Sequence, residues 1–144
     1  MNTEKMNRFL KAHEQYYDTA LWEIQSGQKR TCWMWFIFPQ VIGLGFSEES
    51  IYYAMESYEQ AETYLENEIL RDHYVEICEA ICTLETDDIE EIFPYPDHLK
   101  LHSSLTLFLD IDPDMDAPKE VLDRFFYGKK DKKTLAVLEE WMGF

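Results

Sequence analysis

One segment of the sequence, residues 97–109, is apolar on every side when its residues are projected onto a helix. Its large apolar side chains fall on opposite faces, with Leu101, Leu105 and Phe108 on one and Leu99 and Leu107 on the other. Pro96 precedes the segment, in a position that suits the first turn of a helix. A helix without a polar face is normally covered by neighbours on all sides. The sequence therefore predicts a central helix that other elements must enclose.

The rest of the chain predicts those enclosing elements, and almost all of them are helices. Apolar residues recur at helical spacing in residues 6–26, 57–66, 67–84 and 87–93, in a segment that ends at Gly128, and in residues 131–141. Gly27 suits a helix C-terminus, Ser57 a capping box and Asp131 a helix N-cap. Residues 32–38 form the only plausible strand. We therefore expect one all-α, bundle-like domain of seven or eight helices over residues 1–144.

Charge limits the partners of such a domain. The 144 residues include 13 Lys and Arg against 29 Asp and Glu, which gives a formal net charge of −16. An acidic surface repels phosphate backbones and anionic lipids, so we expect neither nucleic acid nor a membrane as a partner. No apolar run approaches the ~20 residues that a membrane helix needs, and the N-terminal residues do not resemble a signal peptide. Three cysteines are too few for a disulfide framework, and we expect a reducing cytoplasm.

Two histidine patterns fall short of a metal site. His98 and His102 lie four residues apart on the central helix, but no third ligand of matching geometry is evident. His13 and Glu14 begin like a zinc-protease motif, but Tyr17 occupies the position of the second histidine. We therefore predict no metal site, and the sequence indicates no particular cofactor.

The first candidate site combines two cations with a block of aromatic residues. Lys29 and Arg30 lead into Trp33 and Trp35, and the block ends shortly before Gln40. Planar rings beside a guanidinium group suit stacking on a flat ligand or holding a phosphate. Packing of the rings in the core is the alternative.

The second candidate lies on the central helix, where Lys100 and Ser103 share a side with Leu107. A buried ammonium group is costly unless it is paired, so Lys100 is a candidate for anion binding or proton transfer. Ser103 with Lys100 also matches a nucleophile–base pair. The alternative is a lysine that reaches a carboxylate such as Asp123, with the serine hydroxyl bonding back to its own helix.

A third feature is a basic cluster formed by Lys129, Lys130, Lys132 and Lys133. Such a cluster can contact an anionic ligand or balance acidic groups. Because the chain is so acidic, we predict salt bridges for these four side chains.

Three motifs together resemble a family of unknown function found in bacteria and fungi, some members of which carry the automated label calpastatin. The motifs are Trp-Met-Trp-Phe-Ile-Phe-Pro-Gln at residues 33–40, Asp-x-Leu-Lys-Leu-x-Ser-Ser-Leu-Thr-Leu-Phe at residues 97–108 and Leu-Asp-x-Phe-Phe-x-Gly at residues 122–128. The resemblance covers about residues 7–138 and implies an all-α fold with no established activity. Calpastatin itself is a long disordered repeat protein, whereas this chain has the composition of a folded domain. Cys32 and His13 stand where the family pattern has His and Gln.

These features favour a pocket between residues 29–40 and the central helix that binds a small phosphate- or nucleotide-like anion. The predicted ligand-binding residues are Lys29, Arg30, Trp33, Trp35, Gln40, Lys100, Ser103 and Asp123. The alternative is a non-enzymatic protein-interaction module that uses the acidic and aromatic surface. Because no nucleophile, base and orienting group can be placed together, the sequence predicts no reaction, and it leaves the oligomeric state open.

Overall fold

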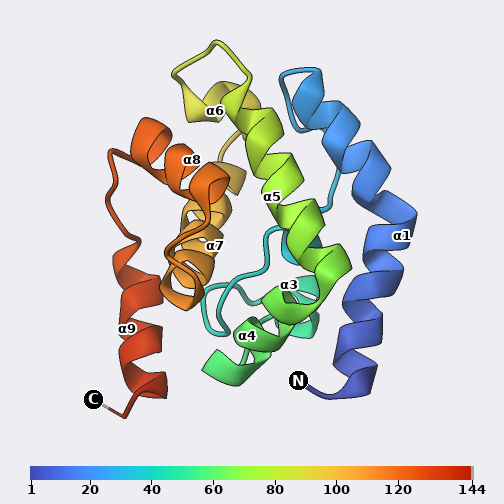
Figure 1. Ribbon diagram of the computed structural model, residues 1–144, viewed down its shortest axis with the longest axis vertical. Coiled ribbons are helices and arrows are strands. Elements are labelled where there is room, and N and C mark those ends of the chain that lie inside the picture. Colours follow the sequence, from blue (N-terminus) through green and yellow to red (C-terminus); the bar gives the residue numbers. More distant parts are fainter. Residues whose placement is uncertain (144) are drawn as a thin grey trace.

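The computed structural model describes residues 1–143, and within them the protein is built from helices (Figure 1). The described chain forms nine helices in the order α1 (Thr3–Gln25), α2 (Met34–Ile37), α3 (Glu48–Tyr52), α4 (Tyr58–Glu66), α5 (Glu68–Cys82), α6 (Ile89–Ile92), α7 (Asp97–Ile111), α8 (Asp116–Phe126) and α9 (Lys132–Trp141). The β pairing within residues 1–143 is an isolated bridge between Val41 and Met55. The predicted all-α class is therefore confirmed, and α2 and α3 are helices that the sequence did not predict.

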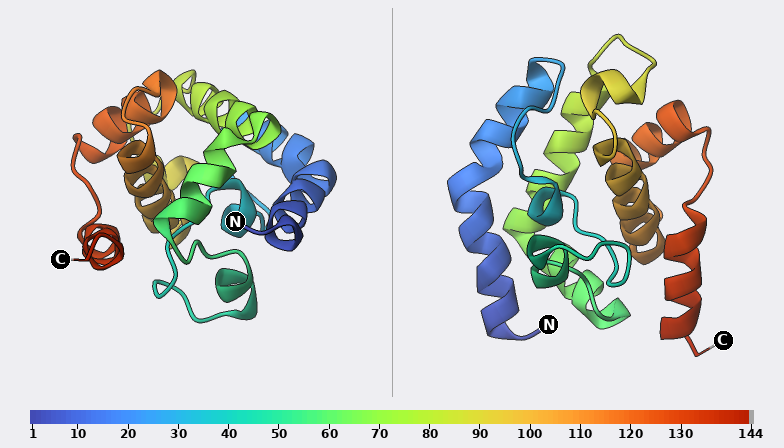
Figure 2. Two further views of the ribbon diagram at one scale, coloured as in Figure 1. Left: turned by 60° about the horizontal axis from the view of Figure 1, so that its bottom comes forward. Right: turned by 180° about the vertical axis from the view of Figure 1, so that it is seen from behind.

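Helix α7 occupies the centre, as its apolar faces predict. Leu101 and residues 103–109 are buried, and α7 packs against α2, α4, α6, α8 and α9. Ser104 shares a hydrogen bond with Tyr74 (3.0 Å), and the hydroxyl of Thr106 donates to the carbonyl of His102 (2.9 Å). These polar side chains can lie in the core because their hydroxyl groups have partners. Helix α9 stands at the edge of the molecule and packs mainly against α7 (Figure 2).

Helices α1 and α5 run side by side and close the other side of the core (Figure 1). Phe9 and Ile24 of α1 and Ile77 and Ile81 of α5 are fully buried. Burial of a side chain of this size contributes roughly 1.5–3 kcal/mol relative to leaving it in water. None of the helices in residues 1–143 has both the length and the apolar character of a membrane span.

Several helix ends follow the predicted capping chemistry. Ser57 accepts a hydrogen bond from the amide of Gln60, and Asp131 accepts one from the amide of Thr134. After α1, Gly27 adopts a φ of +97°, a left-handed conformation that favours glycine. The caps at Ser57 and Asp131 fix where α4 and α9 begin.

The predicted strand at residues 32–38 is wrong, because α2 forms there instead. The carboxylate of Glu23 accepts hydrogen bonds from the amides of Arg30 (2.7 Å) and Thr31 (3.0 Å) and from the indole Nε1 of Trp33 (2.9 Å). Burial favours the protonated form of Glu23, but these hydrogen bonds hold its pKa below the usual value. They also fix the segment against α1, where the apolar side chains of α2 are buried as a single helical turn.

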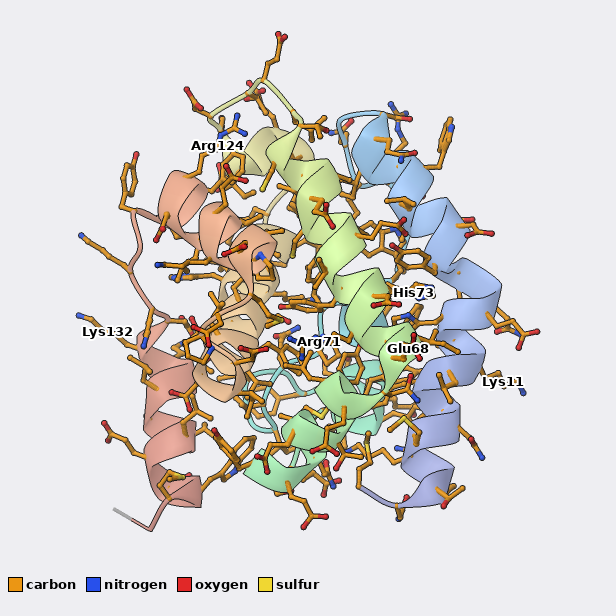
Figure 3. The ribbon with its side chains drawn as sticks, in the orientation of Figure 1. Lys11, Glu68, Arg71, His73, Arg124 and Lys132 are labelled. Carbon is orange, nitrogen blue, oxygen red and sulfur yellow. The ribbon has the colours of Figure 1, made fainter. Side chains whose placement is uncertain are left out.

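A hydrogen-bonded histidine pair joins α1 to α5. His13 Nδ1 lies 2.9 Å from His73 Nδ1, and His13 Nε2 donates to the carbonyl of Phe36 (2.8 Å). His13 is only 3% exposed, and Figure 3 shows His73 between the two helices. Burial, with the charge of His73 contributing, lowers the pKa of His13 to about 4 although the bond to Phe36 opposes the shift. Burial also lowers the pKa of His73, against three nearby carboxylates. Both rings are therefore neutral at pH 7.

We predict that mild acid destabilises the protein through this pair. Between pH 7 and 5 the unfolded chain protonates residue 13, whereas the folded chain, with its lowered pKa, does not, so the free energy of unfolding falls as the pH falls. A folded pKa of about 4 against 6.5 in the unfolded chain corresponds to a loss of about 2 kcal/mol over that range. Urea denaturation at pH 7, 6 and 5 measures the loss.

The control for this prediction is His13→Gln, which keeps a polar group at the position but cannot titrate. Its free energy of unfolding should depend less steeply on pH than that of the unmodified protein. Equal slopes in the two proteins would contradict the role given to His13.

Candidate functional site

An open groove of about 1040 Å³ lies beside the N-terminal half of α7. One wall comes from the loop after α2 and from α3, and the other from the connection between α8 and α9. The first turns of α7 form the floor. The lining residues are Gln40, Leu44, Gly45, Ser50, Pro96, Leu99, Lys100, His102, Ser103, Gly128, Lys129, Lys130, Asp131, Lys132, Lys133 and Leu135. Five of the chain's 13 Lys and Arg residues therefore line one groove.

Four of these lysines lie in residues 129–133, which we call the lysine segment. Lys129, Lys130, Lys132 and Lys133 are exposed, and none of them forms an ion pair with an acidic group in residues 1–143. Figure 3 shows Lys132 extending away from the body of the molecule. The predicted salt bridges are therefore wrong for the described part of the chain. Four ammonium groups instead gather on one wall without acidic partners.

Polar side chains of α7 hold the lysine segment in place. His102 Nε2 donates to the carbonyl of Lys129 (2.6 Å), and the ring of His102 stacks on Phe126 with 4.3 Å between centroids. The amide of Asp131 donates to the hydroxyl of Thr106 (2.9 Å). Since His102 and Thr106 lie one turn apart on α7, they fix both ends of the short stretch between Lys129 and Asp131.

Asp131 connects the lysine segment to α7 and α9 at once. Its Oδ2 accepts hydrogen bonds from the hydroxyl of Ser103 (3.2 Å), the amide of Thr134 (3.0 Å) and the hydroxyl of Thr134 (2.7 Å). Thr134 is fully buried. The carboxylate is thus committed to hydrogen bonds that start α9, and it is not aimed at the neighbouring lysines as a salt-bridge partner.

Lys100 approaches the same groove from α7. Its Nζ lies 3.6 Å from Asp97 Oδ1 and 5.4 Å from the centroid of the Trp35 ring. Asp97 also pairs with Lys29, whose Nζ lies 2.7 Å from Oδ2. One carboxylate therefore holds two ammonium groups, and the carboxylate that satisfies Lys100 is Asp97 rather than Asp123. The contact with the indole is close enough for a cation–π interaction.

The two tryptophans of the aromatic block have different surroundings. Trp33 is 1% exposed, and it packs in the core against Phe38 and Phe93. Trp35 is only partly buried, and its indole Nε1 is enclosed without a hydrogen-bond partner in residues 1–143. Trp35 lines a hollow of about 10 Å³, whose walls include Gln40, which also lines the groove. A hollow of this size has room for about one water molecule.

The structure brings together some of the predicted site residues and separates others. Gln40, Lys100 and Ser103 line the groove, and Trp35 and Lys29 lie next to Lys100 or its partner Asp97. The remaining predictions fall outside this arrangement, namely Arg30, which is exposed, Trp33, which is in the core, and Asp123, which lines a hollow between α5 and α8.

That second hollow contains arginines, but both are already engaged. Arg71 forms an ion pair with Asp112. Arg124 donates to the carbonyls of Cys82 (3.1 Å), Leu84 (2.6 Å) and Thr86 (2.8 Å) at the end of α5. Figure 3 shows both arginines well away from Lys132. The hollow therefore offers less free positive charge than the groove.

The groove does not present the predicted nucleophile–base pair. The hydroxyl of Ser103 donates to the carbonyl of Leu99 (3.1 Å) and to Asp131, as the alternative of a hydroxyl bonding back to its helix predicts. His98 Nε2 lies 3.3 Å from Glu90 Oε1, whereas His102 Nε2 binds the carbonyl of Lys129, so the two imidazoles do not converge. No group of three or more potential metal ligands gathers in residues 1–143. The arrangement is chemically suited to binding an anion.

Several residues that shape the groove carried little signal in the sequence. Leu44 and Leu135 lie in short apolar stretches that indicate packing and no particular site, and Leu99 was expected to be covered yet is 48% exposed. Glu23 has the spacing of an ordinary helix residue, although its carboxylate organises the segment before α2. The lysine segment was visible in the sequence, but the lack of ion pairs of its four lysines in residues 1–143 depends on the fold.

Comparison with known proteins places this all-α domain in a family. The chain matches the family described as a protein of unknown function, DUF1810, over residues 3–138, and it belongs to that family. The crystal structure of the conserved hypothetical protein Rv1873 from Mycobacterium tuberculosis has the same fold, with a TM-score of 0.89 and 36% sequence identity over 93% of this chain and 96% of that chain. A comparison with curated proteins finds no significant match. Neither description carries an activity, so the function rests on the geometry of the groove.

We predict that Asp131→Ala loosens the lysine segment. The substitution removes the N-cap of α9 and the acceptor of two hydroxyl groups, so the free energy of unfolding should fall by about 1–3 kcal/mol. Amide hydrogen exchange in residues 128–134 should become faster. The matched control is Ser57→Ala, which removes the N-cap of α4. If both variants left exchange in residues 128–134 unchanged, the anchoring role of Asp131 would be refuted.

Proposed function

We propose that this protein binds a small phosphate-bearing anion in the groove between the lysine segment and α7. The observation that carries the proposal is the set of four exposed lysines without ion pairs in residues 1–143 of a chain with a net charge of −16. Like charges on one short segment repel each other, and the repulsion grows as their separation falls. An anion that binds between them relieves this repulsion and gains charge-assisted hydrogen bonds.

Each part of the groove has a role in this proposal. The four lysines of the lysine segment supply the charge, and His102, Ser103 and Thr106 fix the backbone that carries them. Lys100 adds a fifth ammonium group, which Asp97 and the Trp35 ring keep in place. Ligand binding does not have to order the segment, because hydrogen bonds to α7 hold it in place before the ligand arrives.

The acidic surface elsewhere restricts the size of the anion. Charges more than about 8 Å away are largely screened at physiological ionic strength. Distant carboxylates therefore reduce the attraction of the groove for an anion only slightly. A long polyanion such as duplex nucleic acid would extend beyond the groove onto that acidic surface and be repelled. A small ligand avoids this repulsion, which supports a phosphate compound over a polynucleotide.

The alternative of a protein-interaction module has weaker support. Exposed apolar side chains that do not line the groove include Trp22 of α1, Ile51 of α3 and Ile69 of α5. They lie on three different helices. The groove brings more charged and polar side chains together than this surface does.

We predict that Lys130→Ala/Lys133→Ala weakens binding of tripolyphosphate roughly ten-fold or more, because each lysine supplies a charge-assisted hydrogen bond. Isothermal titration calorimetry at fixed ionic strength measures the dissociation constant. The control is Lys11→Ala/Lys119→Ala, which removes the same charge from exposed lysines outside the groove. Figure 3 shows Lys11 on the opposite side of the molecule from Lys132.

The two double variants separate a site from a general charge effect. Equal weakening in both would show that tripolyphosphate responds only to net charge and would overturn the proposal. Absence of binding to the unmodified protein at millimolar tripolyphosphate would overturn it as well.

A further inference from the structure

The three most exposed large apolar side chains in residues 1–143 are aromatic, and each adjoins the groove lining in the chain. Phe46 is 88% exposed, Tyr127 is 85% exposed and Tyr95 is 74% exposed. Each is the direct chain neighbour of a residue that lines the groove. The faces of their rings are open to water, which makes them available for stacking.

In the chain, each of these residues adjoins a different side of the groove. Phe46 belongs to the loop between α2 and α3, Tyr95 directly precedes the turn into α7, and Tyr127 directly follows α8. Figure 2 shows the loop between α2 and α3 reaching toward α7. All three residues therefore belong to the segments that enclose one groove.

The lining of the groove itself has two chemical halves. The wall between α8 and α9 is cationic, through the lysine segment. The loop wall and the floor contribute apolar side chains, which are Leu44, Pro96 and Leu99. A phosphate group alone would occupy only a small part of about 1040 Å³ and would leave the apolar half exposed to water.

We propose that the ligand of this groove is a nucleoside di- or triphosphate, an inference that rests on the proposed binding of phosphate. The phosphate chain lies along the lysine segment, and the planar base packs against the apolar half and stacks on an aromatic side chain of the rim. A planar base fits this rim because stacking on an aromatic ring is tolerant of the identity of the base. An inorganic phosphate chain has no planar ring and therefore cannot stack on these aromatic side chains.

The experiment compares ADP and ATP with tripolyphosphate in calorimetric titrations without divalent cations. We expect ATP to bind at least five-fold more tightly than tripolyphosphate, the contribution of one stacked base. The variant Phe46→Ala/Tyr95→Ala/Tyr127→Ala should lose that preference while its affinity for tripolyphosphate stays unchanged. Because all three side chains are exposed, the variant should retain the fold, and circular dichroism checks this.

Controls keep the two proposals distinguishable. Trp22→Ala removes an aromatic side chain that is 63% exposed on α1, outside the groove, and should leave the preference for ATP intact. Equal affinity for ATP and tripolyphosphate would overturn the nucleotide assignment and leave phosphate binding standing. A preference for ATP that survives in the triple variant would also overturn it. Failure of all three compounds to bind would overturn both proposals.

Discussion

Four lysine side chains stand together without acidic partners in the described part of a chain whose net charge is −16, and hydrogen bonds to α7 keep them there. An unanchored segment of this composition would relax toward the many carboxylates of the surface, because ion pairing and lower repulsion both favour that change. His102, Ser103 and Thr106 oppose it by binding the backbone and the Asp131 carboxylate. The charge of the groove is therefore a consequence of how α7 is built.

Helix α7 thus serves both the core and the groove. Its apolar residues fill the centre of the molecule, and its first turns, with Lys100 and the half-exposed Leu99, form the floor of the groove. Asp97 at its start holds Lys29 and Lys100 together, and the Trp35 ring lies beside Lys100. Because its apolar residues are packed in the core, the groups attached to α7 are held in a constant arrangement.

The sequence predicted the parts of the fold that depend on local spacing and failed where distant residues decide. The central helix and the caps at Ser57 and Asp131 were predictable because apolar periodicity and capping are local. The sequence pattern predicts a strand at residues 32–38, and in a strand Trp33 and Trp35 would share a face. The Glu23 carboxylate, from α1, instead holds a helical turn there. Trp33 is the N-cap residue of α2 and Trp35 lies within the helix, and the two indoles separate: one enters the core and the other lies beside Lys100. The pairing of Lys100 with Asp97 and the unpaired state of the lysine segment also depend on tertiary contacts.

The most direct test of this account is a two-dimensional ¹H–¹⁵N correlation spectrum recorded during a titration with tripolyphosphate. The account predicts that the largest amide shift changes fall in residues 128–133 and in the first turns of α7, and that they saturate together. Changes centred on Arg71 and Arg124, or small changes spread over the whole surface, would contradict the claim that the lysine segment forms an anion-binding site.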